Sequence, residues 1–208
     1  MLGLFLPDQG VIEYDGKAYT EFSEDEKKDL SKQIGMVFQG GALFDSMTVE
    51  ENVLFPLRMF TKESRKKLMK RVQEVLKRVN LDGSEQKYPS EISGGMQKRV
   101  SIARAIVNRP KYLFCDEPNS GLDPKTATVI DNLILEITRE YDITTVMITH
   151  DMNSVLEIGE NIAFLKDGVL AWKGDKDQVF KTDDETVTDF IYSSNLFKKV
   201  RTAQLKGL

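Results

Sequence analysis

Two adjacent carboxylates follow a short apolar run near the middle of the chain. Residues 112–115 are apolar and predict a buried strand, and Asp116 and Glu117 come directly after it. The carboxyl ends of parallel strands form the functional edge of an open sheet, so both acids are expected there. Asp116 suits binding of Mg²⁺ through the water shell of the ion, and Glu117 suits polarising an attacking water molecule. Taken alone, the run is equally compatible with a strand followed by a solvated turn.

Small residues open a helix that is predicted from about 93 to 108. The residues at this helix start are Ser93, Gly94, Gly95, Met96 and Gln97. Small side chains leave backbone N–H groups uncovered at the helix N-terminus, where the helix dipole adds partial positive charge, so the segment could bind an anion. The alternative is an ordinary serine N-cap followed by flexible glycines.

Gln39 and His150 each follow another predicted strand. Gln39 comes after the apolar run 34–38, and His150, the only histidine, comes after the β-branched run 143–149. An amide at a strand end could complete the coordination of a metal or reach the water beside a γ-phosphate. A lone histidine is more often structural, but its place after a strand favours a functional role.

Strands that alternate with helices predict a single α/β domain over residues 1–208, with a mainly parallel sheet and helices on both faces. Further strands are expected at 10–16, closed by an Asp-Gly turn, and in a hairpin at 162–165 and 169–172. Further helices are expected at 61–81, 124–140, 175–181 and 185–192. On the helix at 124–140 the apolar positions include Val129, Leu133, Leu135 and Ile137. The helix-rich stretch at about 49–92 interrupts the alternation and is interpreted as an inserted helical subdomain.

Composition narrows the classes of function. The net charge of −4 gives no support to nucleic-acid binding, which needs a basic face. The single cysteine, Cys115, rules out an internal disulfide and fits a reducing compartment. No apolar run approaches the roughly 18–20 residues that a membrane span needs. We therefore expect a cytoplasmic protein that acts at a membrane only through a partner.

Taken in chain order, these features resemble the ATPase subunits of ABC transporters, a family with the P-loop NTPase type of α/β fold. By that resemblance Gln39 is the Q-loop residue, which takes part in catalysis and in Mg²⁺ coordination, and residues 93–97 are the signature that meets the γ-phosphate of ATP on the opposite subunit. Asp116 ends the Walker B strand and binds Mg²⁺, and Glu117 is the catalytic carboxylate. Asp123, in the run Ser-Gly-Leu-Asp at 120–123, belongs to the D-loop, and His150 is the switch histidine.

The resemblance also implies partners and a mechanism. Two ATPase subunits, identical or paired, would sandwich ATP and Mg²⁺ and drive an integral membrane permease, so that this chain is peripheral on the inner face of the membrane. Residues 39–57 look most like the Mla-type ATPases, which work with a permease and a lipid-binding partner to move phospholipid. The alternatives are an ABC transporter for another solute and a non-catalytic subunit. An ATPase of the SMC or Rad type would need long coiled coils, and the sequence contains none.

The sequence departs from the family in one respect, because no run of the form G-x-x-x-x-G-K-[ST] occurs in it. The chain is expected to begin inside the helix that follows this phosphate-binding loop, with the preceding strand missing. Each charge-assisted hydrogen bond from the loop contributes about 1.5–3 kcal/mol. We therefore expect the 208-residue chain alone neither to bind ATP tightly nor to hydrolyse it. We also expect it to be poorly soluble.

Overall fold

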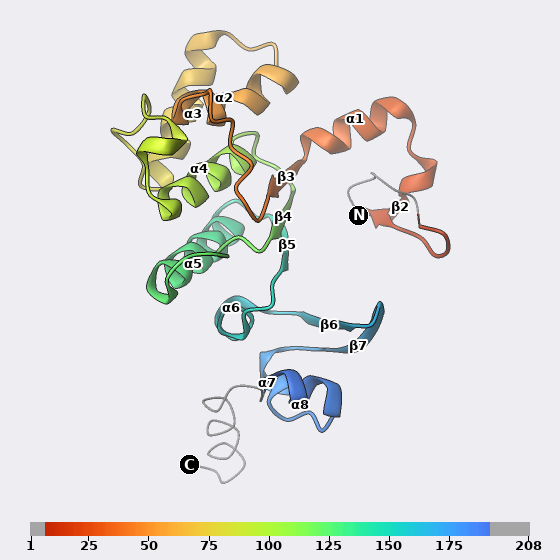
Figure 1. Cartoon of the computed structure of the whole chain (residues 1–208). Helices are drawn as coiled ribbons and strands as arrows, with labels where there is room; N and C mark the ends of the chain where they lie inside the picture. The colour runs from red at the N-terminus through yellow and green to blue at the C-terminus, as the bar shows by residue number, and fades with distance from the viewer. Residues whose placement is uncertain (1–6, 192–208) are drawn as a thin grey trace. The chain divides into compact units, whose positions relative to one another are not determined.

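Three parallel strands form the central sheet, as the sequence predicts. The computed structural model describes residues 7–191, and the predicted helix tail at 1–6 lies outside them. Strands β3 (Ile34–Val37), β4 (Tyr112–Asp116) and β5 (Thr144–Ile148) pair in the order β3-β4-β5 (Figure 1). Val37 is in register with Cys115, and Cys115 with Met147. The carboxyl ends of all three strands therefore meet at one edge of the sheet.

Two helices, α4 (Gly94–Ile106) and α5 (Pro124–Glu140), pack on the same face of this sheet. A Cβ at Gly35 of β3 would lie 2.5 Å from the carbonyl oxygen of Ala105 in α4. The hydroxyls of Thr138 in α5 and Thr145 in β5 are 2.6 Å apart, and Thr145 is on the same face of the sheet as Gly35, because both are in register with Leu113. Helices on the second face of the sheet stay a prediction.

The opposite face of the sheet is only partly covered. Its side chains come from the alternate positions of the three strands, and none of them is buried: Ile34, Met36, Tyr112, Phe114, Asp116, Thr144, Val146 and Ile148. The prediction that β5 is buried is wrong, since Ile148 is 62% exposed. β5 pairs only with β4 among the described strands, so its second edge has no partner there.

The long helix α5 spans the predicted range but buries a different face. The buried apolar residues are Ala127, Ile130, Leu133, Ile134 and Ile137. Val129 is exposed and Leu135 is only partly buried. The buried positions recur every three or four residues, as a helix of 3.6 residues per turn requires, and the expectation for Val129 and Leu135 did not follow that period.

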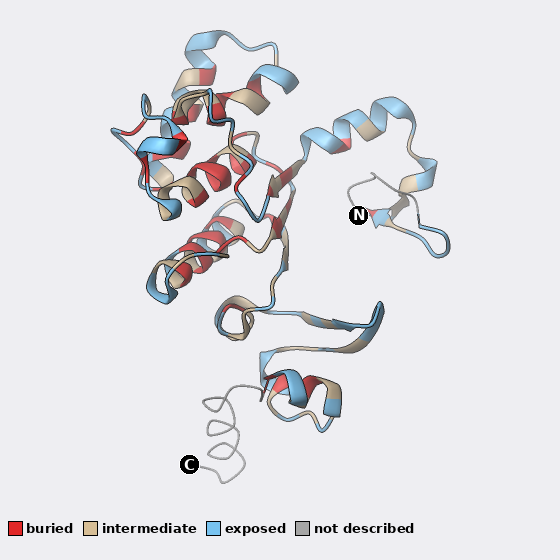
Figure 2. Cartoon of the chain, viewed as in Figure 1, coloured by how far each residue is buried: buried red, intermediate tan, exposed pale blue. Residues whose placement is uncertain are grey.

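Residues 49–92 contain two helices joined by a short connection. α2 (Val49–Phe60) begins at a capping box in which the Thr48 hydroxyl accepts from the N–H of Glu51. α3 (Arg65–Arg78) is shorter than predicted and buries four apolar residues, Leu68, Val72, Val75 and Leu76. A 3₁₀ turn, η2 (Pro89–Glu91), precedes α4. Buried residues of α2, α3 and α4 belong to one core with those of β4 and α5. Figure 2 colours the buried residues of these elements red.

The segment before the sheet forms a small hairpin and a helix. β1 (Glu13–Tyr14) and β2 (Lys17–Ala18) are joined by the predicted Asp-Gly turn, in which Asp15 and Gly16 both have positive φ. A 3₁₀ turn, η1 (Tyr19–Glu21), leads to α1 (Glu24–Lys32), whose N-terminus is capped by Ser23.

The chain divides into two units, residues 1–148 and residues 149–208, and the second is built around an antiparallel hairpin. The hairpin strands are β6 (Ile162–Lys166) and β7 (Val169–Gly174), as predicted. Three short helices accompany it, α6 (Met152–Ile158), α7 (Lys176–Val179) and α8 (Glu185–Ile191). The buried cluster of this unit consists of Val179, Val187 and Ile191. No helix within residues 7–191 is both long and apolar enough to cross a bilayer.

Candidate functional site

The two predicted acids lie at the carboxyl edge of the sheet, where β4 ends. Asp116 is the last residue of the strand, and Glu117 follows it with a left-handed backbone (φ 46°). The Glu117 N–H donates to the carbonyl of Ile148 at 2.9 Å, which extends the β4–β5 ladder by one bond. Left-handed backbone at a residue other than glycine costs about 1–3 kcal/mol and persists only where the surroundings enforce it. The surrounding structure thus holds Glu117, at the acidic end of β4, in a strained backbone conformation.

Gln39 lies at the same edge, at the start of the segment 38–44, which we call the Gln39 loop. β3 ends at Val37, and Val37 pairs with Cys115, the residue before Asp116. Backbone N–H groups of the Gln39 loop make local hydrogen bonds: the Gly41 N–H donates to the carbonyl of Phe38 at 2.8 Å, and the Phe44 N–H to Asn52 Oδ1 at 2.9 Å. The sheet register therefore brings the predicted amide and the predicted acids to neighbouring strand ends.

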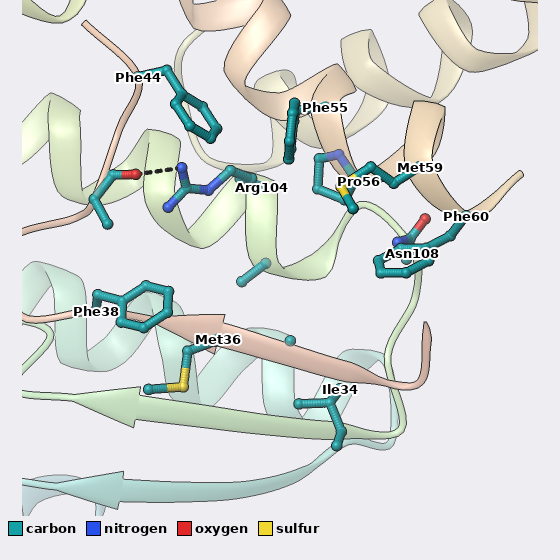
Figure 3. A pocket seen from close by; sticks show the side chains of 13 residues that line it. Ile34, Met36, Phe38, Phe44, Phe55, Pro56, Met59, Phe60, Arg104 and Asn108 are labelled. Carbon is teal, nitrogen blue, oxygen red and sulfur yellow. Dashed lines mark hydrogen bonds between the residues drawn. The ribbon is translucent and has the colours of Figure 1, made fainter. Parts of the chain in front are cut away.

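Two cations of α4 bind the backbone of the Gln39 loop. Lys98 Nζ donates to the carbonyl of Gln39. Arg104 donates to the carbonyls of Gly41 and Ala42, both at 2.7 Å, and the bond to Ala42 is drawn in Figure 3. Ala42 has a left-handed backbone (φ 45°), so the cations hold the loop at a second strained residue.

The predicted signature forms the N-terminus of α4 and packs tightly on its neighbour. Ser93 is the N-cap and accepts from the N–H of Met96 at 3.3 Å. A Cβ at Gly95 would lie 2.9 Å from Thr126 Cγ2 of α5, so a larger residue would require the Thr126 side chain or α5 to shift. The Gln97 side chain donates to the carbonyl of Pro89 at 2.9 Å, which anchors the helix start.

The connection from β4 to α5 carries Asp123, the predicted D-loop residue. Asp123 caps α5: its carboxylate accepts from the hydroxyl of Thr126 at 2.5 Å and from its N–H at 3.1 Å, and these bonds lower the pKa of Asp123. Within the same connection, the buried Asn119 amide donates to both carboxylate oxygens of the buried Asp131 at 3.1 Å. This amide–carboxylate pair fixes the segment between Glu117 and Asp123 on α5.

His150 lies two residues beyond β5, in the second unit, and is exposed. The next residue, Asp151, caps α6 by accepting from the N–H of Asn153 at 2.9 Å. That His150 meets the other site residues stays a prediction.

The acids and the amide at this edge fit a magnesium ion that arrives with a nucleotide. Among residues 7–191 no group of three or more His, Cys, Asp or Glu side chains could hold a metal ion by itself. Magnesium is usually bound by one or two carboxylates together with substrate phosphates and water. Asp116, with Gln39 on the neighbouring strand end, matches that smaller donor set.

Sequence reasoning missed the residues that support these side chains: Lys98, Arg104, Asn119 and Asp131. A signal existed for Asp131, an acid on the apolar face of α5. Lys98 is likewise a charged residue on the buried side of α4, where it is 7% exposed. Their partners lie between 12 and 63 residues away along the chain, and sequence spacing does not reveal such contacts.

Comparison with protein families decides what kind of chain carries this site. The model of the family described as ABC transporter matches residues 1–120, more than half of the chain. The chain belongs to the ABC transporter family.

Its fold is that of ABC ATPase cassettes. The ATP-binding cassette MJ0796, solved as a dimer bound to ADP and Pi, superposes with a TM-score of 0.73 and 34% identity over 83% of this chain and 76% of that one. CbiO1 from Clostridium perfringens, part of the ABC transporter complex cbiONQ, superposes with a TM-score of 0.80 and 32% identity over 100% of this chain and 80% of that one.

Curated relatives of this ABC family chain carry two different transport names. The protein named "Probable ribonucleotide transport ATP-binding protein mkl" from Mycobacterium leprae is 38% identical over 191 residues, which is 92% of this chain and 55% of that protein. The methionine import ATP-binding protein MetN 2 from Bacillus cereus is 40% identical over 188 residues, 90% of this chain and 55% of that protein. The chain thus spans about half the length of these relatives.

Proposed function

We propose that this chain is the ATP-binding and ATP-hydrolysing subunit of an ABC transporter. The observation that carries the proposal is the meeting of Gln39 with Asp116 and Glu117 at one edge of the parallel sheet, beside the helix that starts with the signature. In the proposed site Glu117 polarises the attacking water, and Asp116 and Gln39 hold magnesium that arrives with ATP. His150 steadies the charge that develops on the γ-phosphate.

The proposed assembly is a head-to-tail pair of ATPase subunits. The signature residues, from Ser93 to Gln97, would face ATP bound to the other subunit, and Asp123 would lie at the interface between subunits. The dimeric form of the cassette MJ0796 supports this arrangement by analogy. Because the sequence has no G-x-x-x-x-G-K-[ST] run, the 208-residue chain supplies the signature and the acids but not that phosphate-binding loop.

The proposed contact with a membrane permease uses an apolar pocket beside the Gln39 loop. The pocket has a volume of about 440 Å³ and lies between β3, α2 and α4 (Figure 3). Its lining includes four apolar side chains that are exposed to solvent: Phe38, Phe44, Met59 and Phe60. Apolar surface of this kind, contiguous with Gln39, suits a short helix of a permease and would link permease movement to the ATP site.

The proposed cargo is phospholipid, and the run Gly41-Ala-Leu-Phe-Asp-Ser46 within residues 39–57 supports it by its likeness to Mla-type ATPases. A lipid-binding protein would then be a further partner. The names of the curated relatives favour a second candidate, import of a nucleotide or of methionine. Transport of fluorescent phospholipid, labelled methionine and labelled ribonucleotide by the transporter complex in vesicles distinguishes the three cargos.

The test of the ATPase proposal is a Glu117→Gln substitution. ATP turnover is measured for the 208-residue chain and for a version extended by any in-frame upstream codons, each assembled with the permease. Loss of a general base lowers turnover about 10²–10⁴-fold. We expect Glu117→Gln to lower turnover by this factor in any assembly that hydrolyses ATP, whereas Glu21→Gln, at an exposed glutamate of the same unit, leaves it unchanged. Equal turnover in the Glu117→Gln and wild-type assemblies would contradict the proposal.

For the 208-residue chain alone we expect no ATP binding with a micromolar Kd.

A further inference from the structure

Lys98 is a buried lysine close to three elements of the predicted site: the Gln39 loop, the acidic end of β4 and the signature helix α4. It belongs to α4, the helix that starts with the signature, and is 7% exposed. Its ammonium donates to the carbonyl of Gln39, 59 residues earlier in the chain. Burial lowers the pKa of Lys98, and the carboxylate of Glu117 opposes part of that shift. The ammonium therefore also interacts electrostatically with the acidic end of β4.

The packing around Lys98 leaves little freedom to the Gln39 loop. Ser101, one turn further along α4, donates its hydroxyl to the Lys98 carbonyl at 2.8 Å. A Cβ at Gly41 would lie 3.8 Å from the Cβ of Ser101, so the loop lies directly on the helix at this point. Arg104 binds the loop one turn beyond Ser101. Lys98 also interacts electrostatically with Glu117.

A buried ammonium at this position is costly for stability. Removing a charge from water is costly even when it has partners, and replacing buried ions with apolar residues of similar volume is often neutral or stabilising. A methionine would fill much the same space without that cost. The Gln39 residue is itself exposed, so its carbonyl could bind water in place of Lys98. Packing alone therefore does not account for a lysine here.

We propose that Lys98 is a positioning residue that joins the Gln39 loop to the acidic end of β4, so that Gln39 and Glu117 keep one arrangement relative to α4. Movement of the signature helix would then carry Gln39 and Glu117 with it. The assignment of Gln39 and Glu117 to ATP hydrolysis rests on the proposed function, whereas the mechanical link does not.

The mechanical link is tested on the 208-residue chain by hydrogen exchange. Two bonded amides report on it: Gly41, which donates to the Phe38 carbonyl, and Glu117, which donates to the Ile148 carbonyl. We expect Lys98→Met to speed exchange at both amides by roughly tenfold, while the amides of α5 and the melting temperature stay as in the wild type. Lys98→Arg retains a cation and should restore slow exchange. Lys77→Met, at an exposed lysine of α3, is the matched control and should change neither amide.

The positioning role is tested on the transporter assembled with its permease. We expect Lys98→Met to lower kcat by at least roughly tenfold with KM for ATP within twofold, and Lys98→Arg to recover most of the rate. Unchanged exchange at Gly41 and Glu117 in Lys98→Met would overturn the link. An unchanged kcat, or a kcat that falls only together with the melting temperature, would overturn the positioning role. If neither wild-type assembly, that of the 208-residue chain or that of its extended version, shows turnover, the proposed ATPase function fails, and hydrogen exchange alone then decides on the link.

Discussion

Two of the non-glycine residues with left-handed backbone lie in the candidate site. Glu117 and Ala42 both have left-handed backbone, one at the end of β4 and one in the Gln39 loop. Each is held by a hydrogen bond from or to a neighbouring element, to the Ile148 carbonyl for Glu117 and from Arg104 for Ala42. Backbone contacts as well as side chains thus fix the geometry that the proposed catalytic water would need.

At the residue scale, the structure predicts an inert cysteine. Cys115 is 1% exposed, and burial raises the pKa of its thiol to about 12. At pH 8 only roughly one thiol in 10⁴ would be ionised, and the thiolate is the reactive form. We expect an aromatic disulfide reagent to modify the native chain at least roughly 10³-fold more slowly than the same chain in urea. Because Cys115 is the only cysteine, absorbance of the released thiolate follows this one residue. Rapid modification of the native chain would show that Cys115 is not buried.

Residue types and their order along the chain were sufficient to predict Gln39, Asp116 and Glu117 as neighbours. Each follows an apolar run, and parallel strands bring their ends together. The supporting cations were not predictable in the same way, because Lys98 and Arg104 act on a loop about 60 residues earlier in the chain. A charged residue on the buried side of a helix signals that such a contact exists but not where its partner lies.

At the scale of elements, the starts of α4 and α5 were predicted well because capping is local, whereas α3 begins four residues later than predicted, at Arg65. Ser93 caps α4, and Asp123 with Pro124 starts α5. The buried faces of β5 and α5 were predicted poorly. An apolar strand such as β5 can be buried only if another element covers it, and the strand sequence does not contain that information.

The contact between β3 and α4 gives a prediction at this scale. A Cβ at Gly35 would lie 2.5 Å from the backbone oxygen of Ala105, so α4 would have to move away from the sheet. We expect Gly35→Ala to lower the free energy of unfolding by about 1–3 kcal/mol, the usual cost of overpacking.

Urea denaturation of Gly35→Ala and of a control variant measures this loss of stability. Gly40→Ala is the matched control, since nothing lies within 4 Å of a Cβ there, and it should shift the midpoint little. Equal midpoints for Gly35→Ala and Gly40→Ala would argue against close packing of α4 on β3.

At the scale of the whole molecule, the two units differ in the size of their buried cores. The core of the first unit includes residues from β3, β4 and four helices, whereas that of the second consists of three buried residues with partly buried neighbours such as Trp172 and Phe164. Small cores support little stability by themselves. The second unit should therefore unfold more easily than the first.

The single tryptophan allows this difference to be measured. Trp172 lies in β7 of the second unit, and most of the helix in the described chain belongs to the first. We expect tryptophan fluorescence to change at lower urea concentration than the circular dichroism of the helices. Coincident transitions by the two probes would indicate one cooperative domain instead.

Within the part of the chain that the structure describes, the second edge of β5 has no strand partner. The N–H and C=O groups along such an edge, with the exposed Ile148 beside them, offer a template on which strands of other copies can assemble. Such assembly grows with concentration, so light scattered by a freshly refolded sample should climb steeply as the solution is concentrated. Nucleotide binding and turnover of this chain are therefore best measured after refolding at low concentration, or with a chaperone that covers the second edge of β5.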